Sequence, residues 1–180
     1  MGHHAGISVG PDGATHQMLE DMAIMRALPN MIVIAPCDSV EAKKATIEAA
    51  ENGRPTYIRF AREKTPVMTT EATPFEIGKA LRLRSGRHVT IVACGPLVYE
   101  ALVAGEEVDG EVINCHTIKP LDERTILESV RKTGRVVTVE EHQITGGLGG
   151  AIAELLAEHE AVPMRRVGVR DRFGESGEPE

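Results

Sequence analysis

The sequence predicts an α/β fold with a mostly parallel sheet flanked by helices. Short apolar runs bounded by turn residues alternate along the chain with segments of helical periodicity, which is typical of this class. The run 31–35 (MIVIA) is continuously apolar, as expected of a strand buried on both faces of a parallel sheet. The core must be aliphatic, because aromatic residues make up only 3% of the 180-residue chain and tryptophan is absent.

The first third of the chain predicts two helices and two strands. Residues 17–28 carry methionine, leucine and isoleucine at helical spacing, and Pro29 with Asn30 ends this helix. The strand 31–35 follows. A second helix over 40–51 begins after Asp38 or Ser39, either of which suits the N-cap position. Residues 52–55 (NGRP) break that helix, and residues 56–60 form the next strand.

A change of composition then divides the chain. Residues 63–75 contain two prolines, four threonines and no sustained periodicity, which is typical of a linker or a surface crossing. We expect a first region at 1–68, a linker at 69–76 and a second region at 77–180. In the second region strands and helices alternate again. The strands are expected at 80–84, 89–93, 111–115, 135–140 and 162–169, and the helices at 96–103, 122–133 and 149–159.

Composition excludes several classes of function. The formal net charge of -7 argues against a nucleic-acid surface, which needs a concentrated basic patch. No apolar run approaches the roughly 18 residues of a membrane span, and the first residues lack the apolar stretch of a signal peptide. Cys37, Cys94 and Cys115 are far apart and lie in or beside apolar runs. We therefore expect buried thiols in a reducing cytoplasm, with no metal site.

The segment 4–17 is the strongest candidate for a functional site. His4, Asp12 and His16 fall within thirteen residues of a segment punctuated by glycines and by a Pro-Asp-Gly turn. Titratable side chains on such a loop are where binding and catalysis tend to lie. Arg59 and Arg62 follow a predicted strand, and a guanidinium suits phosphate oxygens. Together these residues predict a polar pocket for a phosphorylated, hydroxyl-rich molecule.

A second candidate lies at 140–150. The run 146–150 (GGLGG) follows a predicted strand and opens a helix, where backbone amides favour anions. Its spacing is not that of a dinucleotide-binding fingerprint, so a tight turn for close helix packing accounts for it better. The preceding residues Glu140, Glu141 and His142 form either a ligand site at a strand end or a solvated charged edge. The sequence leaves both interpretations open.

Several motifs resemble those of transketolases. The stretches 12–17 (DGATHQ), 20–23 (EDMA), 26–31 (RALPNM) and 36–38 (PCD) are similar to the transketolase pyrimidine-binding domain. The stretches 117–122 (TIKPLD), 140–142 (EEH) and 172–177 (RFGESG) are similar to the transketolase C-terminal domain. The resemblance covers essentially the whole chain. It is strongest to the split form of the enzyme, in which the C-terminal half is a separate polypeptide.

This resemblance implies a thiamine diphosphate enzyme that transfers a two-carbon ketol unit from a ketose phosphate to an aldose phosphate. By motif, His16 would be catalytic, lying beside the donor carbons bound to the cofactor and hydrogen-bonding their hydroxyls. Asp12 would read the hydroxyl configuration of the donor, and His4 and Arg62 would hold its phosphate. Pro11 departs from the family pattern, which usually has an acidic residue there.

The resemblance also implies that much of the active site lies outside this sequence. In the family, the activating glutamate and the aromatic residues around the pyrimidine ring precede the histidine loop, and another domain binds the diphosphate and Mg²⁺. We therefore expect a C-terminal half truncated at its N-terminus, inactive and without cofactor when alone. Its partner would be an N-terminal transketolase subunit or domain, in a homodimer or heterotetramer. A 1-deoxyxylulose-5-phosphate synthase fragment, a non-enzymatic α/β dimerisation domain and, least favoured, a nucleotide-binding module are the alternatives.

Overall fold

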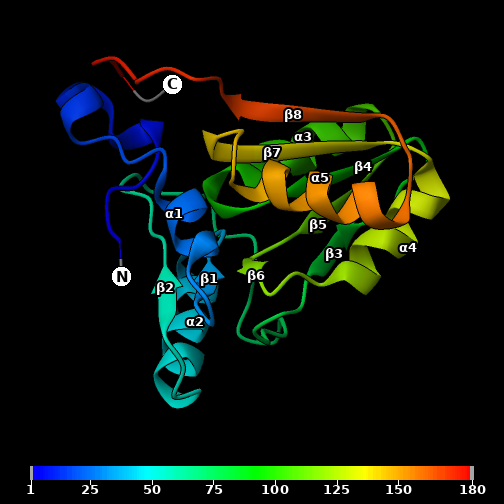
Figure 1. The fold of residues 1–180 in the computed structure, drawn as a ribbon, viewed down its shortest axis with the longest axis horizontal. Coiled ribbons are helices and arrows are strands. Elements are labelled where there is room, and N and C mark those ends of the chain that lie inside the picture. The colour runs from blue at the N-terminus through cyan, green and yellow to red at the C-terminus, as the bar shows by residue number, and fades with distance from the viewer. Residues whose placement is uncertain (1, 179–180) are drawn as a thin grey trace.

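The larger of two sheets has five strands in the order β3-β5-β4-β7-β8 (Figure 1). The structure is a computed structural model that describes residues 2–178. β3 pairs antiparallel with β5, whereas the other neighbours in this sheet are parallel. The predicted α/β fold with a mostly parallel sheet is confirmed. The strands are β3 (Leu81–Arg84), β4 (Val89–Ala93), β5 (Gly110–Asn114), β7 (Val136–Gln143) and β8 (Met164–Val169).

Helices cover both faces of this sheet. A short 3-10 turn, η2 (Gly95–Leu97), leads into α3 (Val98–Glu107), which lies on one face, and α4 (Glu123–Thr133) and α5 (Leu148–His159) lie on the other (Figure 1). Right-handed crossovers require this arrangement, because β5 and β7 lie on opposite sides of β4. The carboxyl ends of β4, β7 and β8 consequently meet at one edge of the sheet.

The smaller sheet joins distant parts of the chain. β1 (Ile32–Ile34) pairs in parallel with β2 (Thr56–Ile58), and β6 (Thr117–Lys119) pairs antiparallel with the other side of β1. β6 is absent from the predicted elements, because three residues are too few for a periodic signal. α2 (Ser39–Glu51) begins where expected, since the Asp38 side chain accepts a hydrogen bond from the amide of Glu41 at 2.8 Å.

The first helix is shorter than predicted. α1 spans Asp21–Ala27 rather than 17–28, because backbone pairing with Ala5 and Gly6 holds Met18 outside the helix. The amide of Gly6 donates to the carbonyl of Met18 at 2.8 Å, and Ala5 forms an isolated bridge with Met18. Tertiary pairing therefore overrides the helical spacing of the apolar residues there.

The largest buried apolar cluster connects the two sheets. It contains Met22 and Val33 from the first part of the chain and Val92, Ile113 and Ile152 from the second. Cys37, Cys94 and Cys115 are buried free thiols, as expected. Among the described residues, no helix is long and apolar enough to cross a membrane.

The turn into α5 confirms the packing role of the glycine-rich run. A Cβ at Gly147 would lie 2.0 Å from Glu140 Oε2, and a Cβ at Gly149 would lie 2.9 Å from Thr138 Oγ1. The Glu140 carboxylate accepts hydrogen bonds from the amides of Leu148 at 2.7 Å and Gly149 at 2.8 Å. It therefore takes the place at the helix N-terminus that a bound phosphate would need, which argues against the nucleotide-binding module.

The interpretation of residues 140–142 as a solvated charged edge is wrong. Glu140, Glu141 and His142 are all buried, and each is hydrogen-bonded to a different part of the chain. Burial raises the pKa of Glu140 to about 7, and the two helix amides offset only part of that rise.

Substituting Gly149 with alanine is expected to lower the free energy of unfolding by about 2 kcal/mol, because the new Cβ must displace the Glu140 carboxylate or Thr138. Gly150→Ala is the matched control. A Cβ there meets only the ends of two long side chains, at 3.5 Å or more, so the better helix propensity of alanine should raise stability by about 0.5–1 kcal/mol. Urea unfolding of both variants measures this, and equal effects would contradict the packing argument.

The free energy of unfolding should change with pH because of the ionisation of Glu140. Its folded pKa of about 7 lies above the ordinary value of 4.5, so between these values the folded state keeps a proton that the unfolded state releases. This contribution to stability is complete below pH 4.5 and is lost as the pH rises through 7. Between about pH 5.5 and about pH 7.5, wild type should lose about 2 kcal/mol relative to Glu140→Gln, which cannot ionise. Urea titrations at the two pH values test this, and parallel pH profiles would refute it.

Candidate functional site

The loop that carries most of the predicted site residues folds as η1 (Ile7–Thr15), two short 3-10 turns rather than the irregular loop that its glycines suggested. Gly10, at φ 76°, and Gly13, at φ 69°, interrupt the turns with left-handed backbone. At Gly13 a side chain is also excluded by packing, since a Cβ would lie 2.3 Å from Ser176 Oγ.

Asp12 and Arg62 come together from separate segments. The Arg62 guanidinium forms an ion pair with the Asp12 carboxylate, and its Nη1 also donates to the carbonyl of Val9 at 3.1 Å. Both side chains remain partly open to solvent, with 38% of Arg62 and 44% of Asp12 exposed. A ligand can therefore reach a cation and a hydrogen-bond acceptor at the same place.

The two predicted site histidines are both exposed. The Nδ1 atom of His16 lies 2.9 Å from the Thr15 hydroxyl. His4 has a left-handed backbone at φ 58°, an uncommon conformation for a residue with a side chain. Within residues 2–178, no hydrogen bond or ion pair joins either histidine to Asp12 or Arg62. The structure thus joins two of the four predicted residues directly and leaves the imidazoles available to solvent.

A buried ion pair holds the base of this loop. The Arg59 Nε atom lies 2.9 Å from Asp21 Oδ2, and each side chain is only 3% exposed. Arg59 Nη2 donates to the carbonyls of Met18 at 3.2 Å and Glu141 at 2.8 Å, and Tyr57 donates to Asp21 Oδ2 at 2.9 Å. Burial, with the nearby Asp21 carboxylate, raises the pKa of Tyr57. Arg59 is thus structural, and of the two arginines after β2 only Arg62 faces solvent.

Glu141 attaches the loop to the larger sheet. Its Oε1 accepts a hydrogen bond from the amide of Ser8, and its carboxylate lies flat against Gly6. A Cβ at Gly6 would be 2.4 Å from the carboxyl carbon, so only glycine permits this approach.

His142 forms a third connection. It is fully buried, its Nδ1–H donates to the carbonyl of Gln143 at 2.6 Å, and its Nε2 accepts from the amide of Ala23 in α1 at 3.4 Å. These partners specify the neutral ring, and burial accordingly lowers the pKa of His142. His142 therefore connects the larger sheet to α1 without carrying charge.

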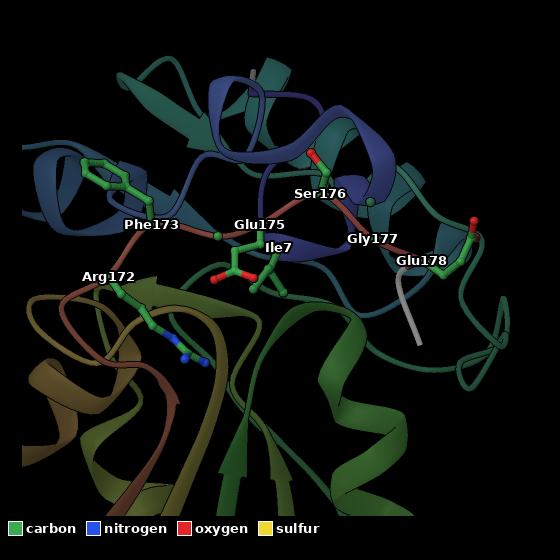
Figure 2. Close-up of a pocket in the computed structure, with 9 residues that line it drawn as sticks. Ile7, Arg172, Phe173, Glu175, Ser176, Gly177 and Glu178 are labelled. Carbon is green, nitrogen blue, oxygen red and sulfur yellow. The ribbon is translucent and has the colours of Figure 1, made fainter.

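The end of the chain crosses the loop. Residues 171–178 are called here the C-terminal strap, and its residues 172–178 border a cavity of about 330 Å³ together with Ile7 and Gly10 (Figure 2). Ser176 points from the strap toward η1 in this view. Gln17 donates from Nε2 to the carbonyl of Glu175 in the strap at 3.2 Å. The sequence assigns no role to Gln17 or to the strap, although the stretches 12–17 and 172–177 are among the motifs quoted for the resemblance.

Among the residues that the structure describes, no cluster of side chains suits a metal ion, and the aromatic rings near the smaller sheet already have partners. Residues 2–178 contain no group of three or more His, Cys, Asp or Glu side chains placed to hold a metal. The rings near the smaller sheet have other partners: Tyr57 bonds to Asp21, Phe60 packs 5.2 Å from the His3 ring, and Phe75 stacks 4.4 Å from the ring of His116.

Comparison with known proteins agrees with the geometry. The family model for the transketolase C-terminal domain matches residues 78–180, and that for the transketolase pyrimidine binding domain matches residues 1–68. The 6-deoxy-6-sulfo-D-fructose transketolase subunit SqwH of Clostridium sp. (strain MSTE9) is 46% identical, over 98% of this chain and 56% of its own length. The putative transketolase C-terminal section of Methanocaldococcus jannaschii is 47% identical, over 97% of this chain and 57% of its own length.

A solved structure described as a split gene transketolase, inactive beta4 tetramer, has a TM-score of 0.88 to this chain and 42% identity, over 97% of this chain and 57% of that one. The chain thus spans a little more than half the length of the relatives it matches. Two family models and the shared fold confirm the resemblance drawn from the motifs. The chain belongs to the transketolase family, and its relatives include C-terminal subunits of the split form.

Proposed function

We propose that this chain forms one wall of the donor-substrate site of a split transketolase, which transfers a two-carbon ketol unit from a ketose phosphate to an aldose phosphate. The observation that carries the proposal is the solvent-facing Asp12–Arg62 pair, because Asp12 lies on the same glycine-shaped loop as the exposed His16. A cation, a carboxylate and an imidazole are the groups needed to bind a phosphorylated polyol. Family membership supports this chemistry.

Each residue has a role in the proposal. Arg62 binds the donor phosphate with its guanidinium and His4 assists it, since both are exposed. Asp12 accepts a hydrogen bond from a donor hydroxyl and thereby reads its configuration. His16, whose Nδ1 is held near Thr15, presents its other nitrogen to the hydroxyls at the reacting carbons.

Thiamine diphosphate with Mg²⁺ would supply the carbanion chemistry when bound in the complete enzyme. We assign that binding to an N-terminal transketolase subunit or domain and to family segments outside this sequence. The lack of a metal-type cluster of His, Cys, Asp or Glu within residues 2–178 supports this assignment. This chain alone would then be inactive and would work within a homodimer or heterotetramer. The buried free thiols support a cytoplasmic location.

Replacing His16 with alanine should lower kcat/KM for the donor ketose phosphate about 100-fold, because a group that hydrogen-bonds to the hydroxyls at the reacting carbons is lost. The assay uses the full subunit that contains this chain, mixed with its N-terminal partner. His159→Ala is the control, since His159 is also exposed but ends α5, far from η1 (Figure 1). Unchanged activity of His16→Ala would overturn the assigned role.

Replacing Arg62 with alanine should raise the KM for a phosphorylated donor about 10- to 100-fold, the worth of a charge-assisted hydrogen bond to phosphate. A donor without the phosphate should show the same KM with the variant as with wild type. Arg54→Ala, at another exposed arginine, should change neither value. An equal effect of Arg62→Ala on both donors would show that Arg62 does not bind the phosphate.

A further inference from the structure

Gln17 holds both ends of η1 and the C-terminal strap with one amide group. Its Nε2 donates to the carbonyl of Ile7 at 3.0 Å, where η1 begins, and to the carbonyl of Glu175 at 3.2 Å. Gln17 itself lies two residues after the end of η1, and only 8% of it is exposed. The hydrogen bonds of this side chain therefore close the loop and attach the strap to it.

Gly174 of the strap packs so closely against the Gln17 side chain that any other residue at this position would clash with it. A Cβ at Gly174 would lie 1.9 Å from Gln17 Oε1. A second close approach joins Ser176 to Gly13, the residue after Asp12, since a Cβ at Gly13 would lie 2.3 Å from Ser176 Oγ. Gly177 differs, because a Cβ there would meet nothing within 4 Å. The strap thus touches the loop at two defined points.

The strap is itself fixed to the larger sheet. Gln143, the last residue of β7, donates from Nε2 to the carbonyl of Arg172 at 2.7 Å and accepts from the amide of Asp171 at 2.9 Å. A continuous path of hydrogen bonds therefore runs from β7 through the strap and Gln17 to the loop that carries Asp12 and His16.

We propose that Gln17 is a positioning residue, which uses the C-terminal strap to hold η1 in the conformation that binds the donor sugar phosphate. The part of this proposal that concerns the donor rests on the function proposed above. When the strap contact is lost, the loop occupies its binding conformation for a smaller fraction of the time. The apparent affinity for the donor falls by that fraction.

The first test is hydrogen exchange on this chain, which needs neither a partner nor activity. The amides of Gly6, Ser8, His16 and Gln17 are hydrogen-bonded and report on the loop. Gly174→Ala should speed their exchange about tenfold, whereas Gly177→Ala should leave it at the wild-type rate. Gln17→Glu, which keeps the shape but places a carboxylate against two carbonyls, should act like Gly174→Ala.

The second test is the split between KM and kcat in the assembled two-subunit enzyme. Gly174→Ala and Gln17→Glu should raise the KM for the donor about tenfold, with the acceptor KM unchanged and kcat within about threefold of wild type. If the strap only stabilised the fold, the two variants would lower kcat, because less enzyme would be folded, and would leave the KM values for donor and acceptor unchanged.

The outcomes separate the two proposals. Loop exchange equal in Gly174→Ala, Gln17→Glu and Gly177→Ala would overturn the positioning role of Gln17, whatever the kinetics. Faster exchange with an unchanged donor KM would overturn its link to donor binding. If His16→Ala is silent as well, the proposed donor site itself fails, while the hydrogen-bonded path from the strap to the loop stands.

Discussion

The buried ion pair between Asp21 and Arg59 is the interaction on which the rest of the arrangement depends. Two charges removed from water are tolerated only when their geometry is good and their remaining hydrogen-bonding groups are satisfied. Here the carboxylate also accepts from Tyr57, and the guanidinium also donates to two backbone carbonyls. One pair therefore fixes the start of α1, the residue after β2 and the end of β7 relative to one another. The functional loop is built on that junction.

Four successive residues at the end of β7 each hydrogen-bond to a different part of the chain. Glu140 holds the N-terminus of α5, Glu141 the loop, His142 the start of α1, and Gln143 the strap. Side chains alternate between the faces of a strand, so Glu140 and His142 face the helices, whereas Glu141 and Gln143 face the loop and strap. A short polar sequence at the carboxyl end of one strand thus organises both layers around the candidate site.

The elements that sequence reasoning predicts well are those whose apolar pattern is local. The run 31–35 contains β1, and Asp38 caps α2 as its chemistry requires. A local apolar pattern gives no information on which distant residue hydrogen-bonds to a given polar side chain. The sequence could not decide between a charged edge and a ligand site for Glu140 and Glu141. The amides that bind these carboxylates come from the turn into α5 and from Ser8, which lie elsewhere in the chain. Arg59 and Arg62 are chemically alike, and only the path of the chain after β2 sends one inward and the other to solvent.

The pairing of β6 with β1 has a consequence for synthesis of the protein. β1 and β2 are complete by residue 58, yet among residues 2–178 the strand that pairs with the open side of β1 is made of residues 117–119. As the chain leaves the ribosome, that side stays unpaired while the intervening residues are made, and a bare strand side is a template for wrong partners. The short length of β1, three residues, limits this exposure. The open side of β1 is therefore protected from wrong pairing only after residues 117–119 have been made.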